Sequence, residues 1–290
     1  MLLAIVLVVS GCTSPTPTAV PTETPNATAT PEPSVTPLPD TAPNFTTVTP
    51  GVLKIPVDTS FPPMEFINTS LTGQDSFVGV DMDLMRAMCK YLNVTPQFET
   101  RAWSTLINDI QVGPYDCSIS SWSITPTRQE SMLYGRPYME TQQTMVVRKN
   151  DNRISNWSDI VALNLTVAVQ DGTTGDLVAQ SLTDMNGTPI NPAKILRFDA
   201  ATTPFDELRK QSADVVVIDY AVNKYQVSTY PGDFKFTGDK WPIKESYAVL
   251  TRKGNDQLMT ALDWAMAKVK ASGEFNATLE KWTLPTTVGL

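Results

Sequence analysis

The stretch YDCSISSWSITPTR, residues 115–128, decides how this chain folds. Its first half predicts a short strand over residues 117–119, and its second half replaces apolar side chains with a run of serine and threonine hydroxyls. Pro126 suits the first position of a helix, and Thr125 suits the N-cap before it. The stretch therefore predicts a strand, a polar turn and the start of a helix.

Arg128 lies in the first turn of this predicted helix. A cation there opposes the helix dipole, so helix formation alone does not explain the residue. A guanidinium held beside hydroxyls and exposed backbone N–H groups forms a receptor for a carboxylate, which it binds bidentately. The alternative is a surface arginine that pairs with Glu130.

The composition excludes several classes of protein. The 290 residues are enough for two ordinary domains. With 22 basic against 30 acidic residues, nucleic acid is not an expected partner. Because the sequence contains no histidine, Ser-His-Asp and Cys-His catalysis are excluded, and no metal or cofactor is expected. Cys89 and Cys117 lie in apolar surroundings and are expected to be buried free thiols, although their pairing stays open.

The N-terminus predicts export. Residues 1–12 contain an apolar run of about eight residues, which suits a signal peptide and is too short to span a membrane as a mature helix. The run ends in VSGC, residues 9–12, which resembles a lipobox, so Cys12 is expected to be lipidated and to become the new N-terminus. No Lys or Arg precedes the run, which leaves a plain hydrophobic N-terminus or an upstream start codon as alternatives.

Residues 13–50 predict a disordered stalk between this anchor and the folded part. The segment is rich in threonine, includes ten prolines and has almost no large apolar side chain to bury. Asn-x-Ser/Thr sequons are more frequent in the chain than chance predicts, which indicates N-glycosylation and would suit an archaeal cell surface. The eight sequon asparagines are Asn26, Asn44, Asn68, Asn93, Asn156, Asn164, Asn186 and Asn276.

From residue 51 onward an apolar strand, a polar turn and a helix follow one another repeatedly. Strands are expected at residues 52–57, 94–98, 144–147, 165–169, 195–198, 214–218, 234–236 and 245–252. The main helices are expected at residues 81–92, 104–111, 155–160, 175–183, 204–211, 255–270 and 274–282. Two batches of strand–helix units predict two α/β lobes, each with a mostly parallel sheet.

Polar residues follow several of the expected strands. In open α/β sheets ligands bind beyond the carboxyl ends of the strands, so these side chains are expected to share one cleft between the lobes. They are Asp58, Ser121, Ser123, Thr173, Thr174 and Asp219.

The chemistry of these residues is complementary. Arg128, Ser123 and the backbone N–H groups around Thr173 suit an anion, whereas Asp219 suits an ammonium group. Two flat apolar walls are available from Phe61 and Trp103. An anion site and a cation site in one cleft describe a receptor for a zwitterion, and a free α-amino acid is the simplest such ligand.

Residues 51–285 resemble the polar amino-acid-binding proteins of extracytoplasmic solute-binding protein family 3, which serve ABC importers. The motifs that carry the resemblance are DTSFPPMEF (58–66), GVDMDL (79–84), WSITPTR (122–128), QDGTT (170–174), DVVVID (214–219) and RKGN (252–255). Each motif is weak alone, but together they follow the family's order and spacing. The resemblance implies a type II periplasmic-binding-protein fold, with lobe 1 formed by residues 51–141 and 244–290, lobe 2 by residues 142–243, and two hinge strands between them.

The resemblance also implies which residues hold the charged ends of an amino acid. The groups around the α-carboxylate would be Arg128, Ser123, Thr173 and Thr174. Asp219 would hold the α-ammonium together with the Ser121 carbonyl. Relative to many family members, Asp171 lengthens the turn before Gly172, which affects the assignment of the two threonines.

For the ligand side chain the resemblance implies a sandwich between Phe61 and Trp103, with Asp58 at its polar end. Trp122 stands where the family often has a smaller residue and is expected to line and narrow the pocket.

Structural explanations stay open beside these roles: a turn cap for Asp58, an N-cap for Thr173 or Asp219, and a core position for Trp103. Glu65 is expected to face solvent or a neighbouring part of its lobe, and Asp81 and Asp83 suit a helix N-terminus.

The leading hypothesis is a monomeric, lipid-anchored binding protein on the outer face of the cytoplasmic membrane that passes a polar or charged amino acid to ABC permease subunits. One alternative is an enzyme of the same fold, a cyclohexadienyl or arogenate dehydratase, with Glu65 or Asp58 as its general acid. Another is a ligand-sensing domain that acts on a separate signalling partner.

Overall fold

The computed structural model describes residues 40–286, which belong to one compact unit. The predicted signal peptide, Cys12, Asn26 and most of the stalk lie outside the described residues. The last part of the predicted stalk contacts the fold: the Val48 N–H donates to Asp116 Oδ1 at 2.7 Å, and Ala42 and Phe45 pack against the core. The folded part therefore begins before residue 50, because these apolar side chains find a surface to bury against.

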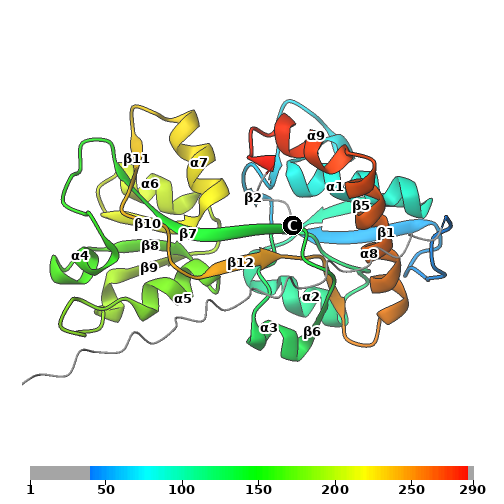
Figure 1. The fold of residues 1–290 in the computed structure, drawn as a ribbon, viewed down its shortest axis with the longest axis horizontal. Coiled ribbons are helices and arrows are strands. Elements are labelled where there is room, and N and C mark those ends of the chain that lie inside the picture. The colour runs from blue at the N-terminus through cyan, green and yellow to red at the C-terminus, as the bar shows by residue number, and fades with distance from the viewer. Residues whose placement is uncertain (1–39, 287–290) are drawn as a thin grey trace, which may run out of the picture. The chain divides into compact units, whose positions relative to one another are not determined.

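Lobe 1 is built on a parallel strand pair covered by helices (Figure 1). β1 (Val52–Val57) pairs with β5 (Thr95–Thr100), with Val52 opposite Thr95. Three helices pack against one another: α1 (Val80–Leu92), α8 (Asp256–Ala271) and α9 (Glu274–Lys281). The other elements are β2 (Ser60–Phe61), β3 (Glu65–Ile67), η1 (Gly73–Ser76), β4 (Phe77–Val78), η2 (Trp103–Thr105), α2 (Leu106–Val112), α3 (Pro126–Ser131), β6 (Met132–Tyr134) and β13 (Leu250–Arg252).

Lobe 2 contains a sheet with the strand order β11-β7-β10-β8-β9. Its strands are β7 (Met139–Arg148), β8 (Val167–Gln170), β9 (Ile195–Phe198), β10 (Val215–Asp219) and β11 (Phe234–Thr237). Strands β10, β8 and β9 are parallel, whereas β7 runs antiparallel to both β10 and β11. The helices are α4 (Trp157–Ala162), α5 (Thr174–Ser181), η3 (Pro192–Lys194), α6 (Thr203–Arg209) and α7 (Tyr220–Thr229).

Two strands connect the lobes. β7 leaves lobe 1 and continues into the sheet of lobe 2, and β12 (Lys244–Tyr247) returns beside it in antiparallel register, with Glu245 opposite Thr141 (Figure 1). Tyr247 pairs with Met139 at the lobe 1 end of this ladder. The chain therefore passes between the lobes twice, through a hydrogen-bonded pair of strands.

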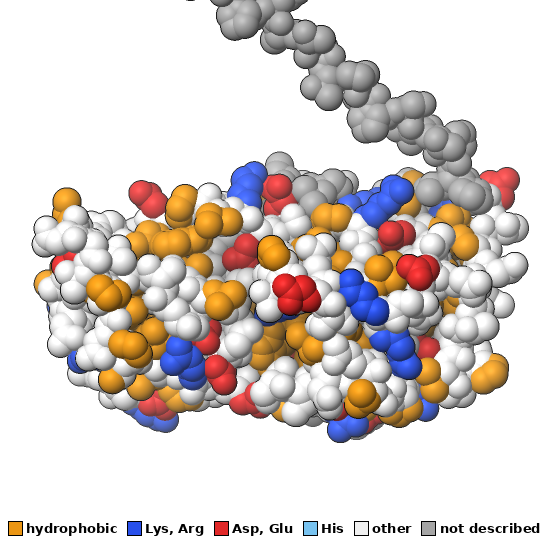
Figure 2. All heavy atoms as spheres, turned by 90° about the horizontal axis from the view of Figure 1, so that it is seen from below, with side chains coloured by type: hydrophobic (Ala, Val, Ile, Leu, Met, Phe, Trp, Pro, Cys, Tyr) orange, Lys and Arg blue, Asp and Glu red, His pale blue; other side chains and the backbone are white. Residues whose placement is uncertain are grey.

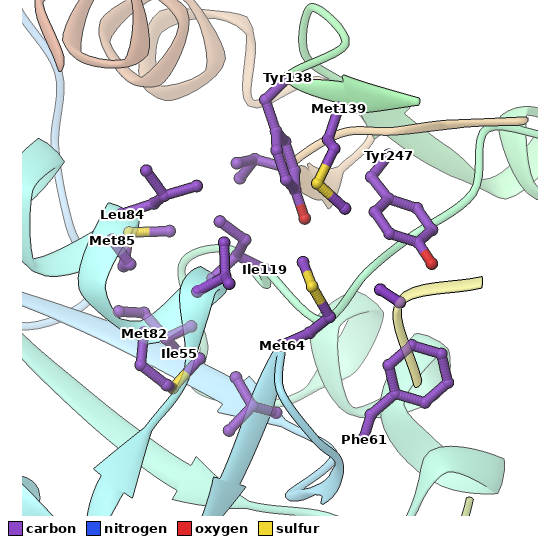
Figure 3. Packing of buried hydrophobic residues seen from close by; sticks show 14 of the residues in the cluster. Ile55, Phe61, Met64, Met82, Leu84, Met85, Ile119, Tyr138, Met139 and Tyr247 are labelled. Carbon is purple, nitrogen blue, oxygen red and sulfur yellow. The ribbon is translucent and has the colours of Figure 1, made fainter. Parts of the chain in front are cut away.

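The main apolar core extends from lobe 1 into lobe 2. In Figure 3, Phe61 and Tyr247 lie on one side of the part that is shown, and Met82 and Met85 lie on the other. All four side chains are buried, and burial of apolar surface of this kind is the main contribution to fold stability. Phe61 therefore belongs to the core and to the edge of the cleft at once.

The prediction of two α/β lobes is confirmed. The sheet of lobe 2 is mixed because β7 runs antiparallel to its neighbours, whereas lobe 1 combines the parallel pair β1–β5 with small separate antiparallel sheets. The strand predicted over residues 117–119 is only a single bridge between Ser118 and Leu250. The strand predicted over residues 245–252 is divided into β12 and β13. The N-cap prediction is confirmed, since Thr125 Oγ1 accepts from the Arg128 N–H at 3.2 Å.

Cys89 and Cys117 are buried and free, as expected. Between residues 40 and 286, none of the helices combines the length and the apolar character that crossing a membrane requires.

Candidate functional site

A cavity lies between the lobes, and nine of the ten predicted ligand-binding residues line it. Lobe 1 contributes side chains from the end of β1, the small β2–β3 hairpin, η2 and the segment leading into α3. Lobe 2 contributes the ends of β8 and β10 and the start of α5, as expected for carboxyl ends of strands in an α/β sheet. The lining residues are Asp58, Phe61, Glu65, Trp103, Ser120, Ser121, Ser123, Arg128, Gln170, Thr173, Thr174 and Asp219.

Arg128 presents a cation to this cavity. Its Nη1 donates to the Ser123 carbonyl at 3.1 Å and its Nη2 to the Gly172 carbonyl of lobe 2 at 3.3 Å. No carboxylate lies within 4.0 Å of the guanidinium in residues 40–286, so the alternative pairing with Glu130 is not formed. Burial lowers the pKa of Arg128, but arginine stays protonated in proteins. The side chain is therefore a half-buried cation whose protein partners are all neutral.

Asp219 lies at the end of β10 and presents a carboxylate to the same cavity. Its Oδ1 accepts from the Tyr247 hydroxyl at 2.7 Å. The residue occupies the N-cap position of α7, yet its side chain makes no capping hydrogen bond, so a capping role does not explain it. Burial and, to a smaller extent, the nearby Glu245 raise the pKa of Asp219 to about 7. A cationic group beside it would restore the ionised form.

The apolar wall of the cavity has two layers. The Trp103 and Trp122 rings stack at 4.4 Å between centroids, and the Arg128 guanidinium carbon lies 5.3 Å from the centroid of Trp103. Trp122 is fully buried and donates its Nε1–H to Ser118 Oγ at 3.0 Å. The prediction that Trp122 lines the pocket is therefore wrong, because its ring packs behind Trp103 in the core formed with Leu106 and neighbouring residues.

The hydroxyl groups of the cavity are engaged by the protein. Ser123 Oγ donates to Glu245 Oε2 at 2.6 Å, and Gln143 Nε2 donates to Thr174 Oγ1 at 3.1 Å. Thr173 caps α5 by accepting from the Asp176 N–H at 3.2 Å, so its structural role is real even though it lines the cavity.

The start of α5 offers backbone N–H groups to the cavity. Within residues 40–286, the N–H groups of Thr173 and Thr174 have no hydrogen-bond acceptor from the protein. Gly175 allows this helix end to approach the sheet closely, because a Cβ there would lie 2.9 Å from the Val217 carbonyl oxygen. A helix start with open N–H groups, opposite Arg128, attracts an anion.

Asp58 fulfils two roles. It accepts from the Ser60 N–H at 3.0 Å, which is the turn cap considered above, and it also accepts from Gln170 Nε2 of lobe 2 at 2.6 Å. Burial raises the pKa of this carboxyl group. Gln170 was not predicted as a site residue, and it links the two lobes at this end of the cavity.

Two carboxylates of the site were missed. Glu65, expected to face solvent or a neighbouring part of its lobe, is buried, contacts Ser120 and Ser121 of the same lobe and also lines the cavity. It lies opposite Phe61 in the β2–β3 hairpin, so the two side chains share a face, and this register could have identified it. Glu245 accepts from Ser123 and from Gln143 Nε2 at 3.1 Å. It comes from the hinge strand, and no local pattern marks it.

Across residues 40–286, His, Cys, Asp and Glu side chains do not form a group of three that could hold a metal ion.

Comparison with known proteins agrees with the geometry. Residues 53–285 match the family described as bacterial extracellular solute-binding proteins, family 3. A probable histidine-binding protein of Neisseria gonorrhoeae is 32% identical over 234 residues, which cover 80% of this chain and 82% of that protein.

Solved structures of similar fold include a mutant of ArgBP from T. maritima, with a TM-score of 0.71, 30% identity and coverage of 80% of this chain and 95% of that one. The arginine-, lysine-, histidine-binding protein ArtJ from Geobacillus stearothermophilus has a TM-score of 0.71, 26% identity and coverage of 81% and 96%.

Proposed function

Since the chain belongs to family 3 of the bacterial extracellular solute-binding proteins, we propose that it binds a free, polar or charged L-amino acid between its lobes and delivers it to an ABC permease. The observation that carries this proposal is the pair of charges in the cavity. Arg128 and Asp219 line one small space, and neither has an ion-pair partner within the described residues. A zwitterion supplies both missing partners at once.

This geometry supports the following roles for the site residues. The α-carboxylate binds Arg128 and the open N–H groups at the start of α5. The α-ammonium binds Asp219, whose carboxylate it keeps ionised. The side chain extends between Phe61 and Trp103 toward Asp58, where polar or cationic groups find an acceptor.

A thermal-shift screen of the twenty amino acids tests the function. A ligand at 100 times its dissociation constant adds about 2.7 kcal/mol to the free energy of unfolding, which is several degrees in Tm for a protein of this size. We expect polar and charged amino acids to give the largest shifts. If no free amino acid shifts the Tm at millimolar concentration, the proposal fails.

The lobes, residues 51–141 with 244–290 and residues 142–243, would close by bending at β7 and β12. Support comes from the contacts across the cleft, since Gln170 reaches Asp58 and Arg128 reaches Gly172. Both contacts join lobe 1 to lobe 2 beside the ligand site. Small-angle scattering with and without the ligand measures the closure, and unchanged scattering would contradict it.

Location follows from the family, whose members are extracellular. A lipid on Cys12 would hold this protein at the outer face of the membrane, and glycans on the sequons would cover its surface. The intact mass of the native protein tests for both the lipid and the glycans.

On the face shown in Figure 2, basic and acidic side chains are interspersed. This mixture suits a monomer in water and does not form the basic surface that a nucleic acid would require.

An enzymatic alternative rests on Glu65. A buried carboxyl group in a small cavity, with its pKa raised by burial and by Asp81, has the properties of a general acid. Incubation with prephenate and with arogenate decides between the two functions, since a dehydratase would aromatise either substrate and a binding protein would leave both unchanged.

A further inference from the structure

Three carboxyl groups gather at one end of the cavity without a cation among them. Asp58 and Glu65 line the cavity, and Asp81 lies behind Glu65 at the start of α1. Ser120 Oγ accepts from the Asp58 N–H at 3.1 Å and donates to Glu65 Oε1 at 3.0 Å. No Lys or Arg of residues 40–286 comes within 4.0 Å of any of the three carboxyl groups.

Glu65 and Asp81 form a close pair. The Ser121 hydroxyl lies 3.2 Å from Glu65 Oε2 and 3.5 Å from Asp81 Oδ2. Asp81 also accepts from the Ser121 N–H at 2.7 Å and from the Tyr138 hydroxyl at 2.8 Å. Glu65 is 1% exposed and Asp81 is fully buried. Two ionised carboxylates on either side of one hydroxyl group, away from water and from a cation, repel each other strongly.

The groups that face the pair come from every surrounding element. They are Asp58 after β1, Tyr138 before β7, and Arg128 and Asp219 across the cavity. On α1 itself, the nearby carboxylate of Asp83 lies 3.7 Å from Arg86 and 2.7 Å from Lys281 of α9, so its charge is already paired. Apart from Arg128, which the ligand carboxylate occupies, every facing group is an acid or a phenol.

A shared proton resolves the repulsion. Burial first, and then the neighbouring carboxyl groups, raise the pKa of Glu65 well above its usual range, and burial raises the pKa of Asp81 to about 6. The ligand-free pair therefore holds one proton near neutral pH, as coupled carboxyl pairs do.

We propose that Glu65 and Asp81 form a proton-exchange site for the ligand side chain, which releases its proton when a cationic side chain enters the carboxyl end of the cavity. This inference rests on the proposed amino-acid-binding function. In the exchange, the Glu65–Asp81 pair loses one proton to bulk water, its net charge changes from −1 to −2, and the ligand cation replaces the proton as the hydrogen-bond donor to Glu65.

A neutral ligand is expected to behave differently. The side-chain amide of L-glutamine can donate a hydrogen bond to Glu65, but it carries no charge to offset a second ionised carboxylate. The pair would keep its proton, so L-glutamine would release only the part of a proton that Asp219 loses to the α-ammonium of any amino acid. Below neutral pH, the affinity for L-arginine would therefore rise about ten-fold more per pH unit than the affinity for L-glutamine.

Titration calorimetry of the whole protein at pH 7.0, in phosphate, HEPES and Tris, counts the protons because these buffers differ in ionisation enthalpy. Because Asp219 contributes equally for both ligands, we expect L-arginine to release about half to one proton more than L-glutamine. The substitutions Glu65→Gln and Asp81→Asn should each remove this difference, and Asp81 does not line the cavity, so its effect cannot come from a lost ligand contact.

Each result of this experiment either supports or overturns the proton-exchange proposal. Equal proton release by L-arginine and L-glutamine, or a difference between them that persists in both variants, overturns the proposal and leaves the binding function intact. Binding of L-glutamine but not of L-arginine or L-lysine also overturns it. Failure of every amino acid to bind rejects the binding function itself. The wild-type comparison alone suffices if either variant does not fold.

Discussion

Two hollows of this molecule are lined by arginine, and they differ in what the arginines contact. The larger hollow, at the surface of lobe 2, is lined by Arg148, Arg153 and Arg209, whereas the smaller cavity between the lobes is lined by Arg128. In the surface hollow, Arg153 lies 2.6 Å from both Asp151 and Asp214. Arg209 likewise lies 2.9 Å from Asp206 and 2.8 Å from Asp233. These cations are already neutralised by the protein.

The difference shows that size does not identify the binding site. Ion pairs at an exposed surface contribute little and leave no charge for a ligand. A half-buried arginine without a carboxylate has given up hydration, and this loss is offset only when an anion arrives. We therefore place the function in the smaller cavity, where Arg128 and Asp219 both lack a charged partner.

The largest expected effect is that of Arg128→Ala. Removal of the guanidinium leaves the ligand carboxylate unpaired in a buried site, which should weaken amino-acid binding by at least 100-fold, or about 3 kcal/mol. Calorimetry measures the affinity, and a near-unchanged circular dichroism spectrum controls for the fold. An affinity within ten-fold of wild type would mean that the ligand carboxylate binds somewhere other than at Arg128.

Asp219→Asn should weaken binding by about 2 kcal/mol, because the asparagine amide oxygen still accepts a hydrogen bond from the ligand ammonium group but carries no negative charge.

Asp219→Asn should also stabilise the ligand-free protein at pH 8. The folded-state pKa of Asp219, about 7, exceeds its usual value of 3.8, so the folded state binds the proton more tightly and stability falls as pH rises between these values. Tm measured from pH 4 to pH 8 should therefore decline less in the variant than in wild type.

Trp103→Leu should weaken binding by about 1 kcal/mol, or roughly five-fold, through loss of the flat wall and of the cation–π contact with Arg128. Trp122→Phe is the matched control, since that ring also lies 5.4 Å from the Arg128 guanidinium carbon, but it does not line the cavity and keeps an aromatic face in the variant. It should lower the Tm while changing the affinity by less than about three-fold. Equal losses of affinity in the two variants would contradict the two-layer wall.

Arg153→Ala should have the smallest effect. The affinity for the amino acid should stay within two-fold of wild type, and the free energy of unfolding should fall by less than about 1 kcal/mol, as for exposed ion pairs. A large loss of affinity here, measured in the same calorimeter, would mean that the surface hollow is coupled to the binding site.

Much of the site could be predicted from the sequence because it lies at the ends of regular strands. Asp58 follows β1, Thr173 follows β8 and Asp219 ends β10, and carboxyl ends of strands in α/β folds face the cleft. The Thr125-Pro126 helix start was equally clear, since cap and proline preferences are local. Local preferences and strand direction together were enough to locate Arg128.

The rest depended on contacts that no local pattern records. Glu245 meets Ser123 across 122 positions of the chain, through the return of the hinge strand. Trp122 lies behind the wall because Ser121 adopts a left-handed conformation, with φ of 49°, which interrupts the extended chain and turns the next side chain into the core. Neither the topology of the return nor a positive φ at a serine can be recognised from the sequence.

The most direct test of the zwitterion site compares one amino acid with its two charge-blocked forms. The ligand that gives the largest thermal shift is titrated by calorimetry beside its C-terminal amide, which lacks the carboxylate, and its N-acetyl derivative, which lacks the ammonium. If Arg128 and Asp219 hold the two charges, both derivatives should bind at least 100-fold more weakly than the free amino acid, about 2.7 kcal/mol each. An amide or an N-acetyl derivative that binds as tightly as the free amino acid would contradict the assignment.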